Sequence, residues 1–248
     1  MFAAASTALR EKLAEVKGFK AQVSGFTAVL HTWGQQMQFH PHLHILVPGA
    51  GINAQGKVIQ VKYPGFLLKT TVLGGAFRAH FRRLFEAKGW QTDPGVWQKD
   101  WGVHIQPAGS GAEALKYLGN YVARSVISDR RIVRSDDETV TFQWKNRDTQ
   151  RTEHMTLSGV EFVRRYLRHV LPRGLRSIRY YGYCHPAALR QRERVRLHTG
   201  CVVHLGAPPA PAKAIGTGIP TCPHCQVAMS LMAKVPANRT GRSPPQRG

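Results

Sequence analysis

Acidic residues are scarce in this chain. Its 248 residues include 14 Asp and Glu against 35 Lys and Arg, which gives a formal net charge of +21. A compact domain this basic repels itself unless polyanions offset the charge, so the composition favours a nucleic-acid partner. The few acids are scattered or gather at Asp136-Asp-Glu138, between two β-rich stretches where a turn explains them. The scarcity therefore argues against an active site built from three carboxylates.

Long apolar runs are also missing. No stretch approaches the roughly 18 apolar residues that a membrane span requires. The first twenty residues lack an apolar signal core followed by a small-residue cleavage site. We therefore expect a cytoplasmic protein.

Cysteine is rare, with four residues at uneven spacing: Cys184, Cys201, Cys222 and Cys225. This is not the pattern of a secreted disulfide framework. Cys222-Pro-His-Cys225 has the spacing of half a zinc ribbon, and a complete site would need two more ligands, such as Cys201 with His204 or His198. The preferred interpretation is a lone CxxC in a flexible tail, with zinc as the less favoured one.

The order of helical and strand patterns predicts an α+β domain with a mainly antiparallel sheet. Residues 1–20 are expected to hold an N-terminal helix, 21–205 the main domain, and 206–248 a Pro/Gly-rich linker and basic tail. Within the main domain we expect helices at 67–88, 111–123, 160–170 and 187–197, a hairpin at 52–63, and strands at 21–33, 42–47, 103–106, 132–133 and 140–144.

The stretch Phe39-His-Pro-His-Leu-His-Ile-Leu-Val47 is the most informative one. Side chains alternate along a strand, so His42 and His44 should share one face, while Leu43 and Ile45 point to the core. Two imidazoles at such positions can share one metal ion. A third ligand must then come from elsewhere. Gln35 is the first candidate, with Gln36 and His40 as alternatives.

A second pattern lies at residues 115–126, where Tyr117 and Tyr121 are four residues apart and would be neighbours on one helix face. A phenol is a weak nucleophile at neutral pH, because its pKa is near 10. It becomes useful where a metal ion stabilises the charge that develops on a phosphate. A tyrosyl phosphate conserves the energy of the broken bond, and the chain has no Gly-rich phosphate loop for nucleotide fuel.

Taken together, these patterns resemble the HUH endonucleases with two tyrosines, and within them the bacterial rolling-circle insertion-sequence transposases. The resemblance covers roughly residues 20–185 and is carried by these motifs: His31-Thr-Trp-Gly-Gln35, His40-Pro-His-Leu-His44, Val47-Pro-Gly49, Tyr117-Leu-Gly-Asn-Tyr121, Thr141-Phe-Gln-Trp-Lys145, His169-Val-Leu-Pro-Arg-Gly174 and Ile178-Arg-Tyr-Tyr-Gly182.

The resemblance implies a central antiparallel sheet flanked by helices, with His42 and His44 as ligands of a divalent metal, Mg²⁺ or Mn²⁺. It also implies that Tyr117 and Tyr121 cut single-stranded DNA at transposon ends and target through 5′-phosphotyrosine intermediates. Members of the family usually carry a cysteine-rich, zinc-binding region ahead of the catalytic domain. This chain begins without one, so a truncated copy is expected.

Basic side chains on the predicted helix 67–88, together with one arginine near the tyrosines, are the expected contacts to DNA phosphates. They are Arg78, Arg82, Arg83 and Arg124.

Several other functions compete with this interpretation. A replication initiator or relaxase would use the same chemistry. The alternation of His40, His42 and His44 is also compatible with a nucleotide hydrolase of the histidine-triad type, although the charge and Pro41 count against it. His80-Phe-Arg-Arg83 has the HxxR spacing of tyrosine recombinases but lacks an upstream arginine partner. A truncated, non-catalytic DNA-binding remnant is the alternative without enzymatic activity.

Overall fold

A computed structural model of the chain describes residues 1–63, 65, 67–109, 113, 119, 126–146 and 148–200. The expected linker and tail at 206–248, and most of the expected helix at 111–123, lie outside this part. The described helices are α1 (Phe2–Glu15), α2 (Thr70–Glu86), α4 (Gly159–Leu167) and α5 (Leu189–Thr199), with four short 3₁₀ helices: η1 (Pro94–Trp97), η2 (Asp129–Arg131), η3 (Gly182–Cys184) and η4 (Pro186–Ala188). None of the described helices is both long enough and apolar enough to cross a membrane.

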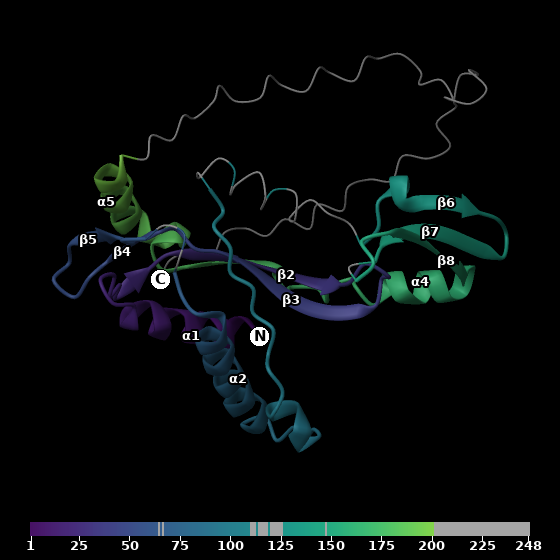
Figure 1. Cartoon of the computed structure of the whole chain (residues 1–248), viewed down its shortest axis with the longest axis horizontal. Helices are drawn as coiled ribbons and strands as arrows, with labels where there is room; N and C mark the ends of the chain where they lie inside the picture. The colour runs from purple at the N-terminus through teal and green to yellow at the C-terminus, as the bar shows by residue number, and fades with distance from the viewer. Residues whose placement is uncertain are drawn as a thin grey trace, which may run out of the picture. The chain divides into compact units, whose positions relative to one another are not determined.

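The described strands form three antiparallel sheets of three strands each, in the orders β1-β4-β5, β3-β2-β9 and β6-β7-β8. Their bounds are β1 (Val23–Ser24), β2 (Phe26–Trp33), β3 (Phe39–Leu46), β4 (Ala50–Ile52), β5 (Val58–Gln60), β6 (Ile132–Ser135), β7 (Thr139–Lys145), β8 (Thr152–Ser158) and β9 (Ile178–Tyr181). In Figure 1, α5 lies beside β4 and β5, and α4 beside β7 and β8. Helices combined with antiparallel sheets confirm the predicted α+β class.

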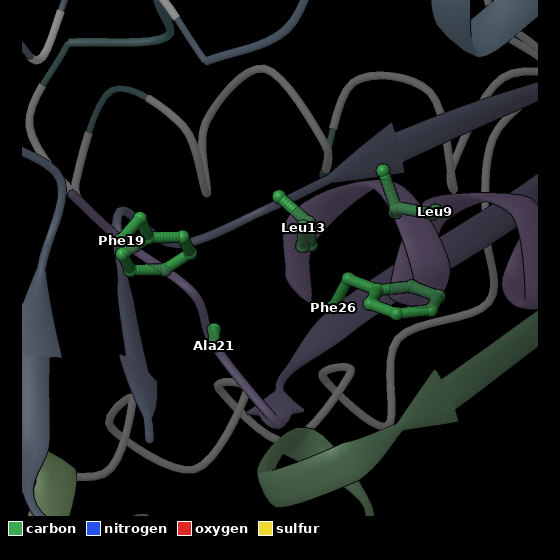
Figure 2. Close-up of a cluster of buried hydrophobic side chains, with 5 residues drawn as sticks. All are labelled: Leu9, Leu13, Phe19, Ala21 and Phe26. Atoms are coloured by element: carbon green, nitrogen blue, oxygen red, sulfur yellow. The ribbon is translucent and has the colours of Figure 1, made fainter. Parts of the chain in front are cut away.

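The first hydrophobic core joins α1 to the long strands. Leu9 and Leu13 of α1 meet Phe26 of β2, and Phe19 and Ala21 of the connecting segment complete the cluster (Figure 2). Further apolar side chains pack against it, among them Ile45, Val47, Leu73 and Tyr181. The predicted inward face of the histidine strand is therefore confirmed for Ile45 and Val47, whereas Leu43 is half-buried and is not part of this cluster.

A second core cluster lies between the β2–β3 turn and the β6-β7-β8 sheet. Phe142 is fully buried and clusters with Met37, Val126 and Ile127. The turn at Asp136-Asp-Glu138 is confirmed, because the Asp136 carboxylate accepts hydrogen bonds from the Glu138 and Thr139 backbone N–H groups at 3.1 and 2.8 Å. These bonds, from Thr139 foremost, lower the pKa of Asp136. The acids of this turn have a structural role, as expected.

Some sequence-based boundaries are wrong. The strand expected at 21–33 is divided at Gly25, and β8 and β9 were not expected. Residues 103–106 form no strand. The chain at Trp101 and Val103 packs closely on α2. A Cβ added at Gly74 of α2 would be 2.8 Å from the Trp101 carbonyl oxygen and 3.6 Å from the Val103 side chain. This close packing on a helix takes the place of pairing with a strand.

Gly182, at the end of β9, is the position least able to accept a side chain. Its φ is +54°, and an added Cβ would collide with the Ser24 carbonyl oxygen of β1. Because both the backbone conformation and the contact oppose a side chain, Gly182→Ala should lower the free energy of unfolding by about 3 kcal/mol. Urea denaturation followed by circular dichroism measures the change.

Gly75 is the matched control, since it lies inside α2 and a Cβ there would meet nothing within 4 Å. Gly75→Ala should raise the free energy of unfolding by about 0.5–1 kcal/mol, because alanine loses less backbone entropy than glycine in a helix. Equal stability of the two variants would contradict the close approach of Gly182 to Ser24.

Candidate metal centre

Three histidines come together on the β2–β3 pair. His31 of β2 and His42 and His44 of β3 each offer one ring nitrogen, and these atoms all lie within 4.8 Å of one another. His31 is buried, with 4% of its surface exposed, and the other two are half-buried. Among the described residues, this is the group of His, Cys, Asp or Glu side chains that is suited to holding a metal ion.

The strand register brings these rings together. His31 lies directly opposite His42 in the antiparallel ladder, and His44 lies opposite Val29, two residues before His31 in β2. Residues opposite one another in such a ladder point to the same face. All three imidazoles therefore project from one face of the β3-β2-β9 sheet, away from the core contacts of Ile45.

Neighbouring groups orient the rings. The Nδ1 of His42 lies 2.7 Å from the carbonyl oxygen of His40. Because a carbonyl only accepts, Nδ1 must carry the proton, which leaves the lone pair on Nε2. The ring of His31 stacks on Trp33 at a centroid distance of 4.5 Å. A hydrogen bond like that of His42 is typical of histidines that ligate a metal.

The donor set fits a divalent ion. Two nitrogens bound to one ion, each at about 2.1 Å, lie at most about 4.2 Å apart. The three ring nitrogens here all lie within 4.8 Å of one another, so small ring rotations could place them around one ion. Three protein ligands also leave coordination positions open, as in catalytic metal sites.

His31 is the site residue that sequence reasoning missed. Gln35 lies in the turn between β2 and β3, and its backbone carbonyl accepts a hydrogen bond from the Arg131 guanidinium. Its proposed role as the third ligand stays a prediction. His40 contributes its carbonyl to His42, and Gln36 contributes its carbonyl to Arg165 at 3.1 Å.

A fourth histidine fixes the turn beside the triad. His169 is 5% exposed and follows α4. Its Nε2 donates to the Met37 carbonyl at 3.0 Å, so its Nδ1, 3.1 Å from the Thr32 hydroxyl, accepts when the ring is neutral. The ring also stacks on Phe39 at 6.3 Å. His169 therefore has both ring nitrogens engaged in holding the hairpin together.

Tyr117 and Tyr121 lie outside the described residues, as does Arg124. The chain directly after them is described. Val126 and Ile127 are 8% exposed and cluster with Met37 and Phe142. Met37 belongs to the turn of the histidine hairpin, so the end of the tyrosine segment is anchored to the hairpin that carries the triad.

The three arginines of α2 that were predicted to contact DNA also make contacts within the protein. Arg78 donates to the Lys99 carbonyl at 2.7 Å, Arg82 pairs with Glu86 at 2.7 Å, and Arg83 lies 3.1 Å from the Nδ1 of His80. Arg82 and Arg83 remain exposed. Cys222 and Cys225 lie outside the described residues, so the zinc interpretation is not tested.

Comparison with known proteins identifies the family. The model of the family described as "Putative transposase" (Y2_Tnp) matches residues 25–193. The chain is 34% identical to the "Putative transposase y4qJ" of Sinorhizobium fredii, over 97% of this chain and 68% of that protein. It is 26% identical to the "Transposase for insertion sequence element IS801" of Pseudomonas savastanoi pv. phaseolicola, over 64% of this chain and 43% of that protein. No solved structure matches significantly.

The family match covers the histidine hairpin, the segment with the two tyrosines and α4. The recognition made from the sequence motifs is therefore confirmed, and the chain belongs to the Y2_Tnp family of transposases.

Proposed function

We propose that this chain is the catalytic part of a rolling-circle DNA transposase, which cuts and rejoins single-stranded DNA through 5′-phosphotyrosine intermediates. The observation that carries the proposal is the three-histidine cluster on β2 and β3, anchored to the segment that follows Tyr117 and Tyr121. The similarity to the Pseudomonas savastanoi transposase for an insertion sequence supports a role in DNA transposition.

His31, His42 and His44 would hold a divalent ion, with Gln35 as the alternative third ligand. Mg²⁺ and Mn²⁺ are both compatible with phosphoryl transfer, and imidazole ligands favour Mn²⁺. When bound, such an ion polarises the scissile phosphate and stabilises the charge that develops on its oxygens. The β3-β2-β9 sheet holds the ligands in place, because each histidine lies on a paired strand.

Tyr117 or Tyr121 would act as the nucleophile. The phenol oxygen forms a bond to phosphorus and releases its proton to solvent, while the bond from phosphorus to the 3′ oxygen breaks and that oxygen takes up a proton. The products are a 5′-phosphotyrosine and a free 3′-hydroxyl. Attack by another 3′-hydroxyl reverses the step and joins a new strand, so no nucleotide fuel is needed.

The chain length limits how far the nucleophiles can lie from the hairpin. Tyr121 is five residues before Val126, which packs in the cluster that includes Met37. Five residues span at most about 18 Å even when fully extended. This short connection is compatible with a role for Tyr121 at this site.

Among the described tyrosines, Tyr183 is a poor alternative nucleophile. Its hydroxyl donates to the Ala50 carbonyl at 2.7 Å, and burial raises its pKa far above the ordinary phenol value. A hydroxyl that is buried and engaged in this way cannot reach a DNA strand.

The test is incubation of the full chain with single-stranded oligonucleotides that carry candidate element ends, labelled at the 5′ or the 3′ end, with Mn²⁺ or Mg²⁺. We expect the 3′-labelled fragment to become protein-linked and the 5′-labelled fragment to be released. Peptide mass mapping should locate the adduct on Tyr117 or Tyr121, and chelation should abolish it.

The exposed Tyr63, at 64% exposure, provides a matched control. Tyr63→Phe should form the adduct as the wild type does, whereas the double variant Tyr117→Phe, Tyr121→Phe should form none. Binding of DNA without any adduct, in folded and metal-loaded protein, would instead favour the non-catalytic remnant. An adduct formed only at a plasmid origin sequence would favour the replication initiator.

A further inference from the structure

Six aromatic side chains gather on α2 and the segment after it, outside the candidate metal centre. This α2 aromatic cluster consists of Phe77, Phe81, Phe85, Trp90, Trp97 and Trp101. It holds three of the five tryptophans of the chain. Yet none of the six belongs to the buried core, and Trp90 is 59% exposed. The other five are half-buried. A large exposed ring on a partly buried aromatic cluster suggests a binding surface.

The cluster is held together by contacts of its own although it is not buried. The Arg78 guanidinium donates to the Lys99 carbonyl at 2.7 Å, and the Trp101 indole N–H donates to the Val96 carbonyl at 3.2 Å. Trp97 and Trp101 stack with their centroids 5.7 Å apart and their planes at 18°. Trp90 lies edge-on to Phe85 with the ring centroids 5.4 Å apart. Rings that are already packed on neighbours lose less conformational entropy when a ligand binds.

The surroundings of the cluster are basic. Residues 69–101 contain six Lys or Arg and three Asp or Glu. Two of the three acids are engaged, because Glu86 pairs with Arg82 and Asp93 accepts a hydrogen bond from the Gly95 N–H at 2.8 Å. The Arg82 guanidinium also lies 5.9 Å from the centre of the Trp97 ring. Exposed cations interleaved with aromatic rings match a polyanion whose unpaired bases can stack.

We propose that the α2 aromatic cluster binds the unpaired bases of single-stranded DNA at a second site, separate from the metal centre, with Trp90 as the main stacking residue. The inference rests on the proposed function in taking single-stranded DNA as the substrate. Figure 1 shows α2 and the short helix η1 extending away from the β3-β2-β9 sheet that carries the histidines. A strand bound there would be held outside the region that is cut.

The charge identifies the occupant. Aromatic rings with arginine also occur in protein–protein interfaces. A chain with a net charge of +21 would, however, repel a second copy of itself, whereas a DNA strand supplies both the negative charge and the flat apolar faces.

The test is the affinity of the full chain for a labelled oligothymidylate of 20 nucleotides. It is measured by fluorescence anisotropy in the presence of a metal chelator, so that no strand is cut. Trp90→Ala should weaken binding about tenfold, the loss of one stacked base. Trp90→Phe should keep most of the affinity. The matched control is Tyr63→Ala, which removes an exposed ring that lies 5.5 Å from the Lys62 ammonium group, and its affinity should match that of the wild type.

An abasic strand of the same length separates stacking from phosphate contact. The wild type should bind this strand more weakly, and Trp90→Ala should cause no further loss. Unchanged oligothymidylate affinity in Trp90→Ala, or an equal loss on the abasic strand, would overturn the proposal. So would a change in oligomeric mass without a change in affinity, since the surface would then serve a protein partner.

Because binding is measured without metal, this result does not depend on cutting. If no tyrosyl adduct ever forms but Trp90→Ala still loses affinity, the proposed reaction fails and the second site stands. If the adduct forms but Trp90→Ala binds normally, only the second site fails. Quenching of tryptophan fluorescence in the wild type by oligothymidylate, and its absence with the abasic strand, checks the same contact without any substitution.

Discussion

Replacing His42 or His44 with alanine should abolish metal-dependent cleavage while leaving most of the affinity for single-stranded DNA. Loss of a group that merely supports a metal ligand costs about 10–100-fold in affinity or activity. Removing a ligand itself should therefore lower Mn²⁺ affinity and cleavage by more than about 100-fold. DNA affinity depends mainly on the basic surface, which neither change alters. Isothermal titration with Mn²⁺ and a cleavage assay measure the two effects.

Substitutions of His31 and Gln35 show which of these two residues is the third metal ligand. If His31 is the third ligand, His31→Leu should weaken Mn²⁺ binding strongly, and Gln35→Ala should leave it nearly unchanged. The opposite result would restore Gln35 as the ligand. His31 is buried, so the folding of the variant must be checked by urea denaturation.

His154 offers a matched control, because it also lies on a strand, β8, but is exposed and outside the three-histidine cluster. His154→Ala should keep both metal affinity and cleavage. Normal cutting by His42→Ala and His44→Ala would contradict the metal assignment altogether.

His44 was predicted from the sequence as a metal ligand, whereas His31 was not, and the reason lies in strand geometry. His42 and His44 share a face because side chains alternate within one strand, which any strand obeys. Placing His31 beside them requires the pairing register of two strands. The turn at residues 34–38, with Met37 at a φ of +58°, and a shift in pairing between His31 and Trp33 at the end of β2 set this register. A slip of one residue would have turned His31 to the opposite face.

The missed strands have a similar explanation. In β8 the half-buried positions are Glu153, Met155 and Leu157, so the inward face carries a charge and its apolar pattern is weak. The Asn146 amide donates to the Glu153 carboxylate at 2.7 Å, and this contact could not be predicted from the sequence pattern. β9 has only four residues, too few for a clear sequence pattern, and it is a strand because it pairs with β2. By contrast, α1 and α2 were predicted well, because their helical patterns are longer and local.

Phe142→Ala should produce the largest loss of stability among the variants considered. Phe142 has no exposed surface, and its ring contacts Phe162 at a centroid distance of 6.1 Å and the Arg131 guanidinium at 5.7 Å. Truncating a buried phenylalanine to alanine removes apolar burial and leaves a cavity, which costs about 3–5 kcal/mol. Urea denaturation measures this loss. On the neighbouring strand β6, Val133 is 55% exposed, and Val133→Ala should change stability by less than about 0.5 kcal/mol.

The same substitution tests how the two halves of the proposed site are joined. Phe142 clusters with Met37, in the turn of the histidine hairpin, and with Val126 and Ile127, which follow Tyr121 by five and six residues. Loosening this cluster should lower the rate of tyrosyl adduct formation even at temperatures where the variant is folded. Mn²⁺ affinity should stay near the wild-type value, because the three histidines are held by the β2–β3 pairing instead. If folded Phe142→Ala protein cuts DNA at the wild-type rate, this cluster contributes to stability but does not position the nucleophile.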